Sequence, residues 1–212
     1  MADAVGDDPP LAEFVPTTGI PPPQVLFGSP WHIEGDQLVH AGGDGEQWLV
    51  FGDPNWRDIE FTYEFFVQGR NSISTLFHVT GPSQATIWGT GWFRQGNFAI
   101  LQHANNTTLF DPLVRAKPSI STQQNQWHTA RTLIRHRSVQ CFVNDFLVWE
   151  FDQLPYSHGR VGLRFWNREG DQTVRVRNIH VKDGNGEILW YGLPELDKNE
   201  CTGRQCGADT AN

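Results

Sequence analysis

The stretch DIEFTYEFFV, at residues 58–67, decides the fold of this chain. Every second position carries a large apolar side chain: Ile59, Phe61, Tyr63, Phe65 and Val67. Most positions between them are polar. Because successive side chains of a β-strand point to opposite faces, this alternation predicts a strand with one face in a core and the other toward solvent.

The same period of two recurs on both sides of this stretch, in short runs separated by turn-forming residues. Further strands are expected at 31–34, 37–41, 47–51, 73–79, 97–103, 139–143, 146–151, 161–166, 174–181 and 188–190. No segment has a convincing helical pattern. Strands that follow one another through hairpins form antiparallel sheets, so the sequence predicts an all-β fold, a two-sheet antiparallel jelly-roll sandwich.

Two local signals fix details of this fold. Asn144 and Asp145 separate two expected strands, and both residue types tolerate the positive φ of a two-residue hairpin turn. In the run at 174–181, the apolar positions change parity near Asn178. An extra residue in one strand produces such a change, so we expect a β-bulge there.

The chain of 212 residues is long enough for one β-sandwich domain. Residues 1–26 are rich in proline and predict an extended arm or linker, residues 27–194 the sandwich, and residues 195–212 a polar tail. Cys201 and Cys206 in the tail are compatible with a disulfide or with two free thiols. Cys141 lies in a strand pattern and is expected to be a small buried side chain.

Charge and composition exclude some functions. The formal net charge of -8 argues against nucleic acid and against anionic membrane surfaces as partners. No apolar run reaches the roughly 20 residues of a membrane span. The first residues do not form a signal peptide. A cytoplasmic location therefore remains open, but the linker-like start favours a piece of a longer, extracytoplasmic or envelope-associated protein.

Short motifs follow one another in a definite order along the chain. They are WHIEGDQL at 31–38, WRDIEF at 56–61, GRNS at 69–72, WH at 127–128, ND at 144–145, GRVGL at 159–163 and RNI at 177–179. Their order and spacing resemble the bacterial 3-keto-disaccharide hydrolase domain family. The resemblance covers about residues 31–193 and implies a concanavalin A-like jelly roll. It also implies metal-assisted cleavage of oxidised glycosides, with carboxylate and histidine groups on the concave sheet.

The sequence departs from the family where that activity would be carried. GNFAI at 96–100 stands where the family has a Gly-x-Glu-x-Gln strand, so the acid is missing. Trp166 replaces the family's histidine, and His78 stands in the place of an arginine with one residue inserted. Catalytic residues therefore stay unknown, and no metal ligand or cofactor is predicted. A divalent metal held by His78 and His103 is the alternative, if their strands are neighbours.

Aromatic and hydrogen-bonding residues supply the candidates for ligand binding, because sugars stack on aromatic rings while polar groups bind their hydroxyls. Trp88, Trp92 and Arg94 lie in a glycine-rich stretch, and Trp166 and Asn167 end a strand. The candidate binding residues are His78, Trp88, Trp92, Arg94, Gln102, His103, Arg164, Trp166 and Asn167. The competing interpretation is that tryptophan fills the core, as expected for Trp31, Trp48, Trp127, Trp149 and Trp190.

Three functions follow from these observations. The first is a non-catalytic module of a larger bacterial protein, with a glycan or oligosaccharide as partner. The second is a divergent, metal-assisted glycoside hydrolase or lyase acting on 3-keto-glycosides. The third is a structural assembly module that associates with itself or with neighbouring domains through the N-terminal arm.

Overall fold

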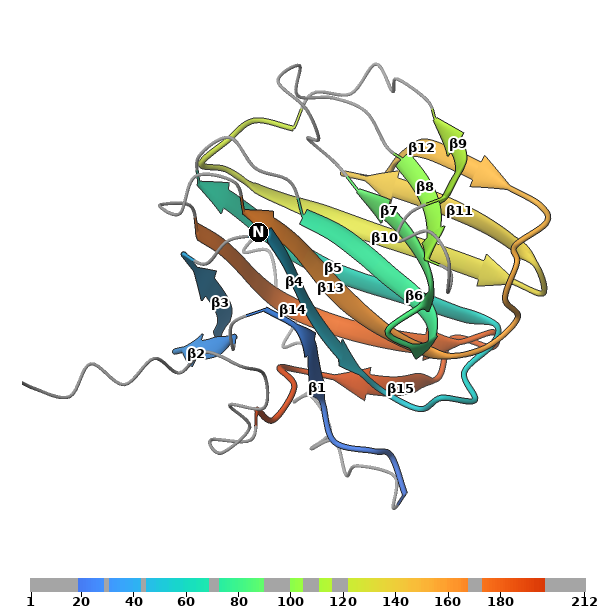
Figure 1. The fold of residues 1–212 in the computed structure, drawn as a ribbon, viewed down its shortest axis with the longest axis horizontal. Coiled ribbons are helices and arrows are strands. Elements are labelled where there is room, and N and C mark those ends of the chain that lie inside the picture. Colours follow the sequence, from blue (N-terminus) through green and yellow to red (C-terminus); the bar gives the residue numbers. More distant parts are fainter. Residues whose placement is uncertain are drawn as a thin grey trace, which may run out of the picture.

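The computed structural model describes residues 19–28, 31–42, 45–68, 73–89, 100–104, 111–115, 122–167 and 173–196. Within these ranges every regular element is a β-strand, and the strands form two antiparallel sheets packed face to face (Figure 1). The prediction of an all-β, two-sheet antiparallel sandwich is confirmed. The described part of the chain has no helix that is long and apolar enough to cross a membrane.

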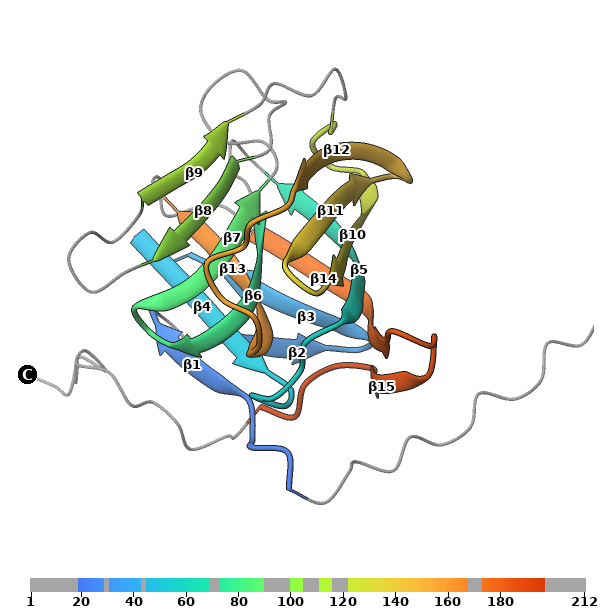
Figure 2. The same cartoon turned by 90° about the vertical axis from the view of Figure 1, so that its right-hand side faces the viewer.

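Seven strands form the first sheet, named sheet A here. In spatial order they are β1 (Gln24–Phe27), β4 (Gly45–Phe51), β13 (Arg160–Asn167), β6 (Ile73–Gly81), β7 (Gln84–Gly89), β8 (Ile100–Ala104) and β9 (Asp111–Arg115). Figure 2 shows β13, β6, β7, β8 and β9 following one another across this sheet. Strand β1 begins at Gln24, inside the segment expected to be an arm.

Eight strands form the second sheet, named sheet B here. In spatial order they are β12 (Phe146–Phe151), β11 (Ser138–Val143), β10 (Trp127–Arg135), β5 (Ile59–Gln68), β14 (Thr173–Asp183), β3 (Gln37–Ala41) and β2 (His32–Glu34). The eighth strand, β15 (Ile188–Tyr191), pairs with the end of β14 beyond β3.

The stretch at residues 58–67 forms β5 and supplies the centre of the core. Its five alternating apolar side chains are all buried, with exposed fractions of 8% or less. Phe61 packs edge-on against Phe51 of sheet A, with 5.9 Å between ring centroids. The two sheets are therefore held together mainly by buried apolar side chains, as the alternation predicts.

The two local predictions are also confirmed. Asn144 and Asp145 have φ angles of 48° and 64°, and they join β11 to β12 as a hairpin. Asn178 has a φ of 51°, and the register between β14 and β5 shifts between Arg177 and His180. Cys141 is buried as expected, and burial raises the pKa of its thiol.

The alternation of apolar residues does not predict four of the strands: β1, β7, β9 and β10. Strand β10 is the informative case, because it lies next to β5 in the middle of sheet B. Its buried positions are occupied by His128, Ala130, Thr132 and Ile134. Only one of these is large and aliphatic, so the alternation does not stand out in the sequence.

Polar side chains join the sheets across the core. The indole Nε1 of Trp88, on β7, donates a hydrogen bond of 2.7 Å to Oγ1 of Thr132 on β10. The hydroxyls of Tyr63 on β5 and Thr75 on β6 lie 2.9 Å apart. Because these atoms are buried, losing one partner leaves the other without a hydrogen bond. Each of these two contacts joins a strand of sheet A to a strand of sheet B, and together they help to position one sheet on the other.

Replacing Thr132 with valine tests the first of these contacts. Thr132→Val keeps the shape of the side chain but leaves the buried Trp88 N–H without its acceptor. We expect the free energy of unfolding to fall by about 1–3 kcal/mol, measured by urea denaturation. Thr129→Val on the same strand is the control, because Thr129 is only half-buried. Equal stability of Thr132→Val and the wild type would show that the hydrogen bond contributes nothing.

Candidate functional site

The outer face of sheet A, which points away from sheet B, is the first candidate surface. Along β4 and β13, Leu49 and Leu163 point into the core, so the alternate residues Trp48, Val50 and Arg164 lie on the outer face. Cross-strand pairing places Trp48, Arg164, Ser74, Gly89 and Ile100 in one row across five strands. The row therefore crosses most of the sheet.

Arg164 is the unusual member of this row. It is 1% exposed, and its guanidinium lies 3.4 Å from the hydroxyl of Ser74. Trp48 beside it is completely buried. A Cβ on Gly89 would lie 2.4 Å from the same hydroxyl, so glycine leaves the space that Ser74 occupies. A buried cation has a high desolvation cost, which makes Arg164 a candidate for a role beyond packing.

Several strand ends meet beside Arg164. Trp166 and Asn167 at the end of β13 pair with Glu46 and Gly45 at the start of β4. Strand β6 starts and strand β7 ends at the same end of the sheet, where Gly89 pairs with Ile100. The backbones of Arg164, Trp166 and Asn167 therefore lie at one end of sheet A.

Two predicted binding residues, Trp92 and Arg94, lie outside the described residues. They belong in sequence to the connection that leaves β7 at Gly89 and returns to β8 at Ile100. Both ends of this connection are at the end of sheet A that carries Trp166 and Asn167.

The other candidates lie elsewhere. Trp88 is 1% exposed, and its indole is bonded to Thr132 in the core, so the packing interpretation holds for this ring rather than sugar stacking. Gln102 and His103 pair with Ile87 and Thr86, farther along sheet A from the strand ends.

The strands that carry His78 and His103 are not neighbours, so the condition for a metal site shared by these two residues is not met. Strands β6 and β8 are separated by β7, because Phe77 pairs with Thr86 and Thr86 pairs with His103. His78 lies toward the opposite end of the sheet, next to Val79, which pairs with Arg160. Among the residues that the structure describes, no group of three or more His, Cys, Asp or Glu is placed to hold a metal ion.

His78 occupies a strained, buried position. Its φ is 51°, at a register shift between β6 and β7, and its side chain is fully buried. Neither ring nitrogen has a hydrogen-bond partner of normal geometry among the described residues. Burial lowers the pKa of His78, although the backbone carbonyls of Arg57 and Tyr156 partly oppose this. A non-glycine residue in this region of φ is uncommon and marks a local constraint.

A prediction about pH follows from this burial. The pKa of His78 is lowered in the folded state, whereas the unfolded chain has a histidine pKa of about 6.5. As pH falls below 6.5, the unfolded state therefore binds a proton first, and the free energy of unfolding decreases. His158 nearby adds to this effect and Asp58 opposes it. We expect urea denaturation at pH 7.5 and 5.5 to show this loss.

His78→Asn should reduce the loss, because asparagine tolerates positive φ and does not titrate. The pKa of His180 is also lowered by burial, so His180→Gln is the comparison. The free energy of unfolding should depend least on pH in the double variant. An unchanged pH dependence in His78→Asn would contradict the assignment.

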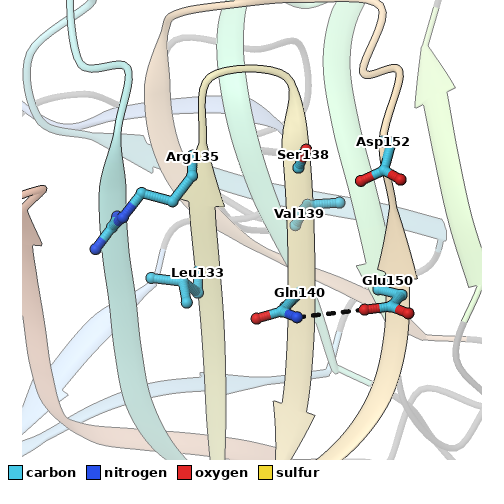
Figure 3. Close-up of a pocket in the computed structure, with 7 residues that line it drawn as sticks. All are labelled: Leu133, Arg135, Ser138, Val139, Gln140, Glu150 and Asp152. Carbon is cyan, nitrogen blue, oxygen red and sulfur yellow. Dashed lines mark hydrogen bonds between the residues drawn. The ribbon is translucent and has the colours of Figure 1, made fainter.

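A second surface contains none of the predicted residues. It is a shallow pocket on the outer face of sheet B with a volume of about 100 Å³ (Figure 3). Its lining residues are Leu133, Arg135, Ser138, Val139, Gln140, Glu150 and Asp152. Sequence reasoning missed it because these are ordinary residues of alternating strands, and they meet only through the pairing of β10, β11 and β12.

The fold resembles several solved structures. The carbohydrate-binding module CBM66 from Bacillus subtilis has a TM-score of 0.63 and 14% identity, covering 79% of this chain and 99% of the module. The carbohydrate recognition domain of Emp46p has a TM-score of 0.60 and 10% identity, covering 76% and 88%. A galectin-like protein of unknown function from Bacillus subtilis has a TM-score of 0.55 and 10% identity, covering 75% and 88%. At these identities the likeness concerns the fold alone.

Comparison with curated proteins gave no match. A family model described as a 3-keto-alpha-glucoside-1,2-lyase-like domain matches residues 23–182. The match covers most of the chain and nearly all of the strands of both sheets. It confirms the resemblance that the ordered motifs indicate. The chain therefore belongs to the 3-keto-alpha-glucoside-1,2-lyase-like domain family.

Proposed function

We propose that this chain is a non-catalytic glycan-binding module that takes its ligand at the end of sheet A where β13 ends. The observation that carries the proposal is the position of Arg164. It is a buried cation on the outer face of the sheet, two residues before Trp166 and three before Asn167.

The chemistry of these residue types supports a sugar as ligand. An amide both donates and accepts hydrogen bonds, so it suits sugar hydroxyl groups. The guanidinium of Arg164, which is 1% exposed and bonded to Ser74, supports the strand that carries these residues. An indole offers a flat apolar face for the C–H groups of a sugar ring. Strand pairing holds the backbone of all three residues in register with β4. Membership of a family described by activity on a glucoside, and the likeness of the fold to CBM66, agree with this ligand class.

Calorimetric titration with a panel of neutral and acidic oligosaccharides tests the proposal. We expect binding of at least one glycan, and a dissociation constant raised about tenfold or more in Arg164→Gln and Asn167→Ala. Arg175→Gln is the matched control, because Arg175 lies on sheet B and is bonded to Glu34. Thermal unfolding of each variant separates lost binding from lost folding. No binding to any glycan would refute the function, and full affinity in folded Arg164→Gln would refute the site.

A divergent glycoside lyase or hydrolase is the second candidate, favoured by the description of the family itself. Turnover of a 3-keto-glycoside that requires an added divalent cation and disappears after chelation would establish this activity. The same assay on Arg164→Gln would show whether both functions use one end of sheet A.

A further inference from the structure

The outer strands of sheet B carry all the exposed large hydrophobic side chains of the described residues: Ile33, Phe146, Leu147, Ile188 and Tyr191. Phe146 and Leu147 are neighbours on β12, the edge strand, with exposed fractions of 64% and 47%. An apolar pair at a sheet edge is a recognised site of association. This pair is therefore a candidate part of a surface that binds another molecule.

The shallow pocket lies along the same edge. In Figure 3, Ser138 and Gln140 of β11 lie between Leu133 of β10 and the carboxylates of Glu150 and Asp152 beside β12. The side-chain amide of Gln140 donates a hydrogen bond of 3.3 Å to Glu150. Leu147 pairs with Phe142 on the strand that carries Gln140, so an apolar end and an acidic end share one outer face.

The charges of this edge differ from those of the rest of sheet B. Elsewhere on sheet B the carboxylates of Glu34, Glu60 and Glu64 are paired with Arg175, Arg131 and Arg177 at 2.8, 3.6 and 2.7 Å. Among the described residues, Glu150 and Asp152 have no ion-pair partner. Residues 144–153 contain no Lys or Arg. Arg135 lines the same pocket, but in Figure 3 its guanidinium lies on the side away from these two carboxylates. The side of the pocket formed by β12 is therefore negative.

These charges decide which partner fits. A second copy of this chain pairing through β12 would bring two acidic edges together, which repel each other. The register shift between Cys141 and Phe142 also interrupts the β11–β12 ladder and hinders the addition of a continuous strand. An extended segment with basic side chains fits both features, because it supplies the missing charge and contacts the edge through side chains.

We propose that the surface formed by β10, β11 and β12 docks an extended, basic segment of a partner protein. An apolar side chain of the segment packs on Leu147, since the ring of Phe142 beside it is covered by the guanidinium of Arg131. Cationic side chains of the segment bind Glu150 and Asp152 over Gln140. Because β12 has one extra residue at the register shift, Leu147 and Asp152 are about four strand rises apart, or about 13 Å, so the segment needs about five residues. This surface is independent of Arg164 and the glycan site proposed on sheet A.

Fluorescence anisotropy with a labelled pentapeptide tests the docking surface. The probe carries leucine at its first position and lysine at its third and fifth positions, which share one face of an extended chain, and glutamate replaces both lysines in the control peptide. We expect the lysine peptide to bind the full chain, more weakly as salt is raised. The double variant Glu150→Gln/Asp152→Asn should raise the dissociation constant about tenfold, and Leu147→Ser should raise it severalfold.

Glu187→Gln is the matched control, because Glu187 is an exposed acid in the hairpin between β14 and β15, and it should bind as the wild type does. Equal binding of both peptides, no binding of the lysine peptide, or full affinity in the folded double variant would each overturn the proposal. Competition by a neutral oligosaccharide would assign the surface to glycan instead. A dimer in light scattering that Phe146→Ser dissociates would assign it to a second copy.

Discussion

Arg160→Ala is expected to lower the free energy of unfolding by about 3–5 kcal/mol. Arg160, at the start of β13, is 7% exposed, and every nitrogen of its guanidinium donates a hydrogen bond. Its Nε donates to the carbonyl of Gly52 at 3.1 Å, and its two terminal nitrogens donate to the side chain of Gln24 at 2.9 Å and the carbonyl of Pro22 at 2.6 Å. Urea denaturation at pH 7.5 measures the loss.

The size of this effect follows from what alanine leaves behind. The acceptors lie at or just before the start of β1 and just after the end of β4, and removal of the guanidinium leaves them without these donors. Hydrogen bonds to a charged group contribute about 1.5–3 kcal/mol each, and some acceptors would recover a water molecule. Arg160→Lys should restore only part of the loss, because an ammonium cannot reproduce the planar array of donors.

Arg131→Ala provides the control. Arg131 contacts a carboxylate, that of Glu60, and lies 3.9 Å over the ring of Phe142, but 27% of its side chain is exposed. Its removal should cost about 1 kcal/mol or less. If both variants lost the same small amount of free energy of unfolding, the hydrogen bonds of Arg160 would not be what holds β1, β4 and β13 together.

Arg160 also illustrates what the sequence could not reveal. Its partners Gln24 and Gly52 lie more than 100 positions away along the chain, and no local pattern marks such contacts. In contrast, the alternation in β5, the hairpin at Asn144 and the bulge at Asn178 depend on neighbouring residues only. These features were therefore predicted correctly.

The candidate site divides in the same way. That Arg164, Trp166 and Asn167 share one end of a strand follows from sequence proximity. Which face of β7 carries Trp88 depends on its pairing with β6 and on the hydroxyl of Thr132, so its burial could not be deduced. The separation of His78 from His103 likewise depends on the strand order, which periodicity does not determine.

Gly159→Ala is the second substitution with a large expected effect, because it affects the backbone around His78. Gly159 precedes β13, has a φ of 144° and donates a backbone hydrogen bond of 2.9 Å to Trp56. A Cβ at this position would lie 2.4 Å from the carbonyl carbon of His78 and 2.6 Å from the amide nitrogen of Val79. Backbone strain and overpacking together predict a loss of roughly 2–6 kcal/mol in the free energy of unfolding.

Gly81→Ala is the matched control, since Gly81 lies at the end of β6 and a Cβ there would meet no heavy atom within 4 Å. Its stability should stay within about 0.5 kcal/mol of the wild type.

The comparison also bears on pH, because Gly159 lies against the backbone of His78, and a displacement of that backbone would move the buried ring. In a folded Gly159→Ala protein, the segment at Gly159 and the backbone of His78 should therefore move apart. This should bring the pKa of His78 closer to 6.5, as an NMR titration of its imidazole would measure. Full stability together with an unchanged imidazole titration would mean that the backbone around His78 accommodates the added Cβ without cost. It would also mean that the packing of Gly159 against His78 does not cause the low pKa.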